Sequence, residues 1–234
     1  MKIEIVPAIL IKNKKDFFNR LTTAGGFAKT VQIDIMDGIF VNNKTPKPLN
    51  NATWYAEYVL KNKEKIPIPE IELHLMVINP WKIIDKWKEF ERVRRIIWHV
   101  ETPIEHSEFI SAIHHLDLQA CLAINPHTPL SDLKPHISTK KINKKNNSSF
   151  IDSILVMDVV PGKGGQKFLP SVLKTIRTLH KKYPHLTIAT DGGINQKTAK
   201  DVIKAGATRL NAGGSIFLAD DPKLAYHTLH KHNS

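Results

Sequence analysis

Short apolar runs recur along the chain at regular intervals, and amphipathic segments with helical spacing lie between them. Most of these runs are nearly continuous in apolar residues, which is typical of strands in a parallel sheet that is covered on both faces. The eight strands predicted in this way are Ile3–Leu10, Val31–Met36, Ile71–Val77, Arg95–Glu101, Ala120–Asn125, Ile154–Val159, Leu186–Asp191 and Thr208–Gly213.

The intervening segments carry signals for the start and end of helices. Asn79-Pro80 predicts a helix with proline in its first turn. Asn195 is suited to cap a helix that ends at Gly206, and Pro222 opens a last helix that reaches about His230. Eight β–α units in one chain of 234 residues predict a single (β/α)8 TIM barrel over residues 1–234. An open doubly wound sheet is the competing fold, and the regularity of the eight units favours the barrel.

One stretch departs from this alternation. Residues 138–149 are polar, basic and rich in asparagine, and they follow a predicted helix. We therefore expect a surface loop insertion on the N-terminal face of the barrel, opposite the rim that usually carries catalytic residues.

Charge and composition narrow the classes of function. The formal net charge is +12, but the lysines are scattered and their densest cluster has no interleaved aromatic residues for base stacking, so no nucleic-acid partner is expected. No apolar run reaches the roughly 18 residues that a membrane span requires, so no membrane association is expected. The single cysteine, Cys121, excludes an intramolecular disulfide, and the reducing cytoplasm is the expected compartment.

Polar residues close several of the predicted strands, whose carboxyl ends meet at one mouth in a barrel. Asp34 and Asp191 close the second and seventh strands, so their carboxylates can face a bound substrate from different sides. This arrangement suits epimerisation next to a ketone, where one group removes a proton and another returns one to the opposite face. A divalent metal held by carboxylate and imidazole groups would stabilise the enediolate. The other polar residues expected at the mouth are His74, His99, Asn125 and Asp158.

Three consecutive strands are each followed by a glycine motif, and this pattern predicts phosphate binding by backbone amides. The motifs contain Gly162, Lys163, Gly164 and Gly165 after the sixth strand, Gly192 and Gly193 after the seventh, and Gly213 and Gly214 after the eighth. Lys163 adds a positive charge or points to solvent. Met36, Met76 and Met157 occupy late positions on their strands, where they either fill the core or line the mouth.

Taken together, these motifs resemble the ribulose-phosphate 3-epimerase family. The resemblance follows the family's order through nearly the whole chain, which is more specific than any single motif. The segments that carry it are Val6–Leu10, Asp34–Asn43, Leu73–Pro80, His99–Glu101, Ile124–Leu130, Ile154–Phe168, Asp191–Asn195 and Ala212–Phe217.

The resemblance implies a barrel that interconverts ribulose 5-phosphate and xylulose 5-phosphate, with a small sugar phosphate as its partner molecule and homo-oligomers as its assembly. It also implies a divalent metal (Zn, Fe, Mn, Co or Mg) held by two histidines and two aspartates, with the aspartates as the acid/base pair. By motif position, Asp34 and Asp191 match these aspartates and His74 matches one histidine. The positions matched to substrate are Met36, Met76 and Met157 against the enediolate, and Gly162 to Gly165, Gly192, Gly193, Gly213 and Gly214 at the phosphate.

The chain departs from the family pattern at several of these positions. The family's other ligand histidine is replaced by Gln32, a neutral amide that suits Mg²⁺ or Mn²⁺ better than Zn²⁺. A substrate-contacting serine is replaced by Ala8, and a loop phenylalanine is Lys163. The sixth strand has Asp158 in place of serine or threonine, and the late glycine–serine pair reads Gly213-Gly214.

Three functions are compatible with this pattern. The first is an active ketose-phosphate 3-epimerase with an altered metal site, in which Gln32 takes the place of a ligand. The second is a catalytically impaired family member that binds sugar phosphate, which Gln32 and Ala8 favour. The third is a related phosphate-binding barrel with other chemistry, in which a lysine near an aspartate, such as Lys163 near Asp158, supports carbanion formation.

Overall fold

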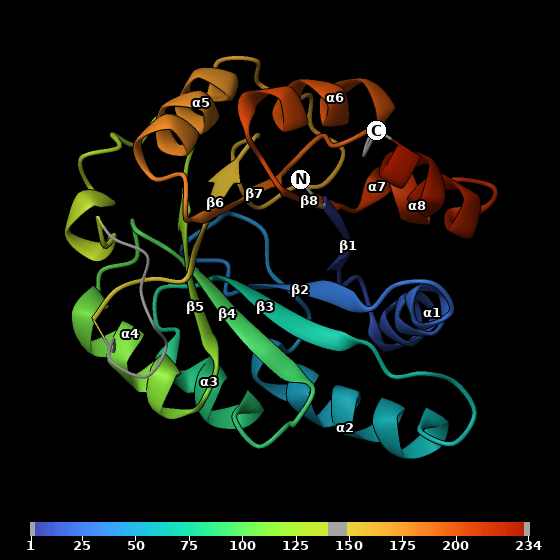
Figure 1. Ribbon diagram of the computed structural model, residues 1–234. Helices are drawn as coiled ribbons and strands as arrows, with labels where there is room; N and C mark the ends of the chain where they lie inside the picture. The colour runs from blue at the N-terminus through green and yellow to red at the C-terminus, as the bar shows by residue number, and fades with distance from the viewer. Residues whose placement is uncertain (1–2, 140–148, 232–234) are drawn as a thin grey trace.

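The computed structural model describes residues 3–139 and 149–231 and has a closed barrel of eight parallel strands. Each strand pairs with its neighbours in sequence, and β8 closes onto β1 (Figure 1). The strands are β1 (Glu4–Leu10), β2 (Thr30–Met36), β3 (Glu70–Met76), β4 (Val93–His99), β5 (Gln119–Ile124), β6 (Ser153–Met157), β7 (Thr187–Asp191) and β8 (Arg209–Ala212). The predicted (β/α)8 TIM barrel is confirmed.

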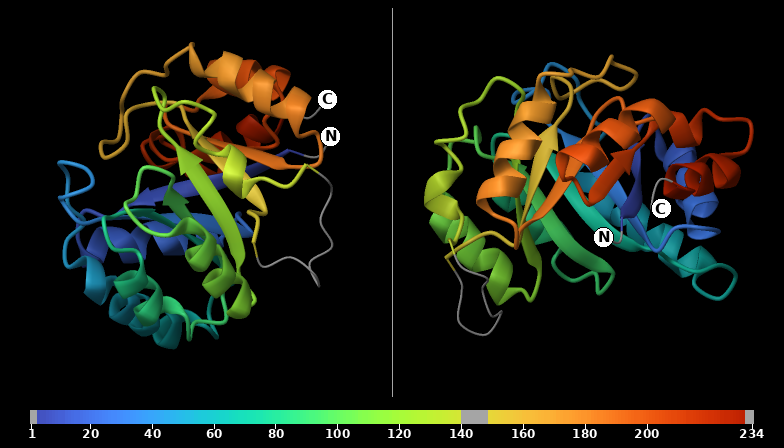
Figure 2. Two further views of the ribbon diagram at one scale, coloured as in Figure 1. Left: turned by 90° about the vertical axis from the view of Figure 1, so that its left-hand side faces the viewer. Right: turned by 45° about the horizontal axis from the view of Figure 1, so that its top comes forward.

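The helices lie on the outside of the strands, as the views in Figures 1 and 2 show. Within the described residues they are α1 (Lys14–Gly25), α2 (Asn51–Asn62), α3 (Trp81–Trp87), α4 (His106–His115), α5 (Val172–Lys182), α6 (Gln196–Ala205), α7 (Gly214–Phe217) and α8 (Pro222–His230), with short 3-10 turns at Pro48–Asn50 and Lys134–His136. No helix in this part of the chain has the length and apolarity needed to cross a membrane.

Side-chain alternation along each strand separates two packing layers. In β2, Ile33 and Ile35 belong to the main apolar cluster that also contains Phe17 of α1 and Tyr55 of α2. The alternate residues of the strands point into the barrel. On β4 to β7 these inward residues form a second apolar cluster, which consists of Ile97, Cys121, Ala123, Leu155, Met157 and Ala189.

Strand register brings the polar inward positions of β2 and β3 together. Gln32 lies opposite Glu72, and Asp34 lies opposite His74. On the other side of the barrel closure, Asp191 of β7 lies opposite Asn211 of β8. The residues predicted to carry chemistry therefore project into one interior.

The predicted strand limits agree with the observed ones to within two residues, and the largest uniform shift is in the fourth strand. This strand was expected at Arg95–Glu101 and runs from Val93 to His99. Its first half carries charged residues whose partners lie on β3, because Arg94 bonds Glu70 and Arg95 bonds Glu72. A strand prediction that is based on runs of apolar residues does not detect such charged pairs between strands.

Two further expectations concern chain segments outside the strands. Most of the predicted loop insertion at 138–149 falls on residues 140–148, which lie outside the described residues. α8 runs from Pro222 to His230, as predicted, and α3 begins at Trp81, directly after Pro80.

The predicted cap of α6 is present and also supports the loop after β7. The Asn195 side chain accepts hydrogen bonds from the backbone N–H groups of Lys197 and Thr198, and Thr198 Oγ1 accepts one from the Asn195 backbone. The Asn195 amide and the Thr198 hydroxyl both donate to the carbonyl of Gly193. The helix ends at Gly206, whose φ of 113° is in the left-handed region that favours glycine.

We expect Asn195→Ala to lower the free energy of unfolding by about 1 kcal/mol, because the first turn of α6 loses its acceptor. Urea denaturation followed by circular dichroism measures this change. Gln196→Ala, at the exposed next position, is the matched control and should leave the stability nearly unchanged. An equal loss in both variants would contradict a capping role for Asn195.

Candidate active site

A cavity of about 420 Å³ opens at the carboxyl ends of the strands. Its lining contains every residue that the sequence predicted for catalysis or substrate binding, with Gln32 as the one exception. These residues are Ala8, Asp34, Met36, His74, Met76, Met157, Gly162, Lys163, Gly164, Gly165, Asp191, Gly192, Gly193, Gly213 and Gly214. Segments far apart in the sequence therefore share one cavity, and its volume suits a small metabolite.

Asp34, His74 and Asp191 form a compact polar cluster at this cavity. One ligand-type atom from each residue lies within 4.8 Å of the others. His74 Nδ1 is 3.1 Å from Asp34 Oδ1 and 3.7 Å from Asp191 Oδ2. Two carboxylate oxygens and one imidazole nitrogen are donors that suit a divalent first-row metal or Mg²⁺, so this set of residues fits such an ion.

Gln32 lies against this cluster and is fully buried. Its Nε2 donates to Asp34 Oδ1 at 2.8 Å and to Asp191 Oδ2 at 2.6 Å, and it is 3.4 Å from His74 Nδ1. Its Oε1 accepts a hydrogen bond from Asn211 Nδ2. Gln32, predicted as a substitute metal ligand, thus presents its nitrogen rather than its oxygen to the cluster.

Burial and neighbouring charges shift the pKa values of Asp191 and His74 in this cluster. Burial and the neighbouring charge of Asp34 raise the pKa of Asp191 to about 7, although His74 and Gln32 oppose the shift. Burial alone would lower the pKa of His74, but its contact with Asp34 and the charges of both aspartates raise it above its ordinary value. Asp191 therefore retains a proton near neutral pH more readily than an isolated aspartate does.

A second histidine, His99, lies in contact with His74. His74 Nε2 is 2.9 Å from His99 Nε2, and burial lowers the pKa of His99 to about 4. His99 is therefore neutral, and its Nε2 shares one hydrogen bond with His74 Nε2. His99 Nδ1 lies 3.3 Å from Glu101 Oε2, so His99 sits between the cluster and an acidic residue of the rim. His99 was expected at the mouth, and the structure gives it a supporting position behind His74.

Asp158 does not reach the cavity, although the sequence suggested it for the mouth. Leu155 and Met157 of β6 point inward, so Asp158 continues the outward phase of the strand. Its side chain is fully buried, and within the described residues neither carboxylate oxygen makes a hydrogen bond of good geometry, although the side chain of Thr190 interacts with it. Burial, with a smaller contribution from the charge of Asp191, raises its pKa well above the ordinary value.

The glycine loops after β6, β7 and β8 meet along one side of the cavity. Gly193 has a φ of 66°, and a Cβ atom there would lie 2.9 Å from the backbone nitrogen of Phe168. Only glycine fits this left-handed position against the neighbouring loop. The β7 loop therefore packs backbone to backbone against the end of the β6 loop, which gathers the motifs as predicted from the sequence.

Sequence reasoning did not find two basic residues of the cavity and one acidic residue of an adjoining loop. Lys12 and Arg20 line the cavity, and the Arg20 guanidinium also stacks on Phe217 and pairs with Asp16. Asp37 accepts hydrogen bonds from the backbone N–H groups of Ile39, Phe40 and Ile78, which ties the loop after β2 to the end of β3. Arg20 lies within a helix among many other basic residues, so no local signal marks it. The position of Asp37 directly after a predicted strand was a signal that could have identified it.

The fold and the cavity define a (β/α)8 barrel with two carboxylates and an imidazole beside a cavity at the carboxyl ends of its strands. The model of the ribulose-phosphate 3-epimerase family matches residues 4–217, and the chain belongs to this family. The ribulose-phosphate 3-epimerase of Schizosaccharomyces pombe is 32% identical over 227 residues, which cover 95% of this chain and 90% of that protein. The ribulose-phosphate 3-epimerase of Methanocaldococcus jannaschii is 34% identical over 201 residues, which cover 84% of this chain and 76% of that protein.

Solved structures with little sequence identity share the fold. The 3-hexulose-6-phosphate synthase of Salmonella typhimurium superposes with a TM-score of 0.65 at 13% identity, over 98% of each chain. At this identity the likeness supports the barrel architecture and carries no argument about chemistry.

We expect the buried Asp158 to make the protein lose stability as the pH rises. Because the folded state raises the pKa of Asp158, it binds a proton that the unfolded state has released, and the free energy of unfolding falls from about pH 4 upward. Each unit of pKa difference costs about 1.4 kcal/mol. Asp158→Asn should therefore flatten the decline in stability as the pH rises above about 4, as measured by denaturant unfolding at a series of pH values.

The control for this experiment is Asp220→Asn, which removes one charge at an exposed position. It should leave the pH dependence of stability as it is in the unmodified protein. Parallel pH curves for Asp158→Asn and the unmodified protein would show that Asp158 is ionised in the folded state.

Proposed function

We propose that the protein epimerises a ketose phosphate at C3, interconverting ribulose 5-phosphate and xylulose 5-phosphate, with Asp34 and Asp191 as the acid/base pair. The observation that carries the proposal is the pair of carboxylates from β2 and β7, which line one cavity beside three glycine loops. Membership of the epimerase family and the names of the relatives support the choice of substrate.

Proton transfer follows from the two carboxylates and their unequal surroundings. One carboxylate takes the C3 proton of the substrate, which leaves an enediolate, and the other, in its protonated form, gives a proton to the opposite face of C3. The pKa of about 7 for Asp191 makes this residue a competent proton donor near neutral pH. The reverse reaction exchanges the two roles, so one proton is shared by the pair throughout the cycle.

Asp34, His74 and Asp191 would hold the divalent metal of this site, and the ion would stabilise the negative charge of the enediolate as a Lewis acid. Zn, Fe, Mn, Co and Mg are all compatible with these donors. Met36, Met76 and Met157 line the same cavity and present apolar surface to the enediolate, where they exclude water without competing for its proton.

We expect the phosphate group of the substrate to bind beside the glycine loops. Backbone amides of Gly192, Gly193, Gly213 and Gly214 are suited to donate to phosphate oxygens there. Arg20, Lys12 and Lys163 line the same cavity and give it positive charge that favours a dianionic phosphate. Ala8 leaves the cavity without the hydroxyl that the family resemblance implies.

One observation favours a second function, that of a sugar-phosphate-binding protein with impaired catalysis. Gln32 Nε2 already donates to one oxygen of Asp34 and one oxygen of Asp191. These hydrogen bonds compete with any other use of the same oxygens. Such a protein would gain thermal stability with ribulose 5-phosphate and show no exchange at C3.

We expect exchange of the C3 proton of ribulose 5-phosphate with solvent deuterium, together with formation of xylulose 5-phosphate. Asp34→Asn and Asp191→Asn should each slow both processes by about 10²–10⁴-fold, because each removes one proton-transfer group. NMR in D₂O measures exchange and product together. Asp201→Asn, at an exposed position of α6, is the matched control. Full exchange in either site variant would contradict the two-aspartate mechanism.

We expect Arg20→Gln to raise KM for ribulose 5-phosphate by about 10-fold with little change in kcat, because a charge-assisted contact to the phosphate is lost far from C3. Steady-state kinetics coupled to xylulose 5-phosphate detection provide both constants. Lys15→Gln, on the exposed side of the same helix, controls for the loss of general positive charge. Equal KM values for the two variants would place the phosphate elsewhere.

A further inference from the structure

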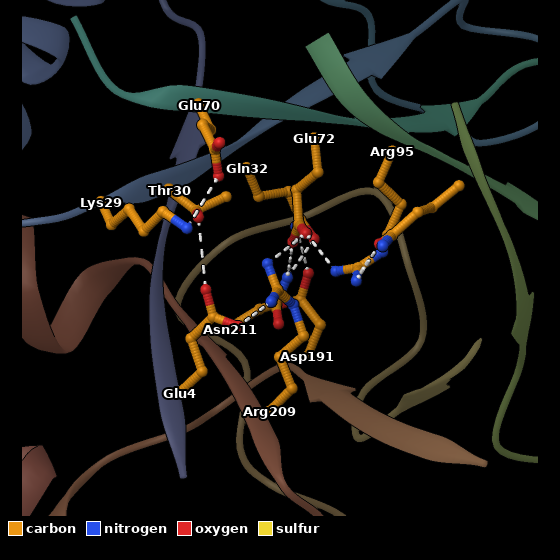
Figure 3. A network of polar contacts seen from close by, with 11 residues as sticks. Glu4, Lys29, Thr30, Gln32, Glu70, Glu72, Arg95, Asp191, Arg209 and Asn211 are labelled. Carbon is orange, nitrogen blue, oxygen red and sulfur yellow. Dashed lines mark hydrogen bonds and ion pairs between the residues drawn. The ribbon is translucent and has the colours of Figure 1, made fainter. Parts of the chain in front are cut away.

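A chain of buried polar side chains runs through the barrel interior below the candidate site, and Figure 3 shows most of its members. It begins at Glu72 of β3, whose carboxylate is only 1% exposed. Glu72 Oε2 accepts from Arg95 Nη1 at 2.9 Å and from Arg209 Nη2 at 2.6 Å. Two guanidinium groups donate to this one oxygen, an arrangement that requires the ionised carboxylate. The carboxylate can therefore only accept hydrogen bonds.

The remaining oxygen of Glu72 determines how the Asn211 amide is turned. Glu72 Oε1 is 2.6 Å from Asn211 Nδ2, and an acceptor at this distance requires the NH₂ group rather than the carbonyl of asparagine. The same nitrogen donates to Gln32 Oε1. Both hydrogens of Asn211 Nδ2 are then in use, one on each neighbour.

The orientation of the Gln32 amide follows from the orientation of the Asn211 amide by the same reasoning. Because Asn211 offers a donor, Gln32 must turn its carbonyl oxygen toward Asn211 and its NH₂ group toward the mouth. The two hydrogens of Gln32 Nε2 then meet Asp34 Oδ1 at 2.8 Å and Asp191 Oδ2 at 2.6 Å. Donors and acceptors alternate without a conflict from Glu72 to the two aspartates, over the four strands β2, β3, β7 and β8.

We propose that Gln32 is a positioning residue that donates hydrogen bonds to both site aspartates, and that Glu72 and Asn211 prevent its oxygen from becoming a metal ligand. Turning the Gln32 amide would set its NH₂ group against the NH₂ group of Asn211. It would also set the Gln32 oxygen against the two carboxylates when no cation lies between them. The inference rests on the proposed function in that it concerns the same carboxylates, and it assigns three protein ligands to the ion, which leaves a position for substrate oxygen.

The test is to remove the donor that holds Gln32 in place and to measure the affinity for Mn²⁺. Asn211→Leu keeps the approximate size and the charge of the side chain and removes its donors. Gln32 can then turn its oxygen to a cation, so we expect Mn²⁺ affinity to rise by about 10-fold, comparable to the gain or loss of one supporting interaction at a metal site. Isothermal titration calorimetry measures the affinity without reference to turnover.

A double-mutant cycle identifies Gln32 as the source of the gain. Gln32→Met is made in the unmodified protein and in Asn211→Leu, and Gln196→Met, at an exposed position on α6, is the matched control. We expect Gln32→Met to lower Mn²⁺ affinity about 10-fold more in the Asn211→Leu background than in the unmodified protein. Unchanged or weaker Mn²⁺ binding in Asn211→Leu, or equal effects of Gln32→Met in both backgrounds, would overturn the proposal.

A measurement on the unmodified protein applies even if these variants fold poorly. The side-chain amide signals of Gln32 are followed in ¹H–¹⁵N NMR spectra during titration with diamagnetic Zn²⁺, together with signals of the exposed Gln196 side chain as reference. Both Gln32 protons should keep their slow exchange with solvent as the ion binds. Loss of that protection on Zn²⁺ binding would show that the amide turns, and the proposal would fail.

These readouts separate the inference from the proposed function. If the predicted Mn²⁺ and NMR results appear but C3 exchange of ribulose 5-phosphate is absent, the role of Gln32 stands and the epimerase activity does not. If exchange is present and Asn211→Leu does not strengthen Mn²⁺ binding, the activity stands and the positioning role of Gln32 is rejected.

Discussion

The carboxylate of Glu72 is the group on which the polar interior of this barrel depends. A buried carboxylate without partners is too costly for a folded protein, and the two guanidinium groups of Arg95 and Arg209 make its ionised form tolerable. Once Glu72 is ionised, its neighbours have one acceptable orientation each. The hydrogen-bonding direction set there continues through Asn211 to Gln32 and reaches the aspartates at the mouth.

The interior is divided into a polar and an apolar half. On β5, β6 and β7 the inward positions hold small or apolar residues such as Cys121, Leu155 and Ala189. On β2, β3 and β8 they hold the amide and charged groups described above, with Met36 and Met76 as the apolar exceptions at the mouth. Asp191 stands at the boundary, and its surroundings explain why its pKa rises to about 7: burial removes water, and Asp34 adds a like charge. The fold thus gives two chemically identical side chains unequal surroundings, as the proposed acid/base pair requires.

Much of this molecule could be predicted from the sequence. The continuous apolar strands, the cap at Asn195 and the stop at Gly206 are local signals, and each lies within a few residues of the element that it determines. Strand-end positions also predicted that Asp34, His74 and Asp191 line the cavity, because the carboxyl ends of all strands in a barrel open to the same side. Three other strand-end residues, His99, Asn125 and Asp158, are not in its lining, and Asp158 shows why. A residue one position beyond the strand end changes face, and only the observed end of β6 at Met157 decides that face.

The sequence by itself determined the barrel, its order of elements and the group of residues at its mouth, because these follow from short-range periodicity and from strand ends. Only the tertiary structure decided how Gln32 is oriented, why Asp158 is excluded from the cavity, and that Arg20 is included in it. Each of these depends on contacts between strands or helices that are distant in sequence. Hydrogen-bond direction in particular is a property of a closed network, and no single residue in the sequence carries it.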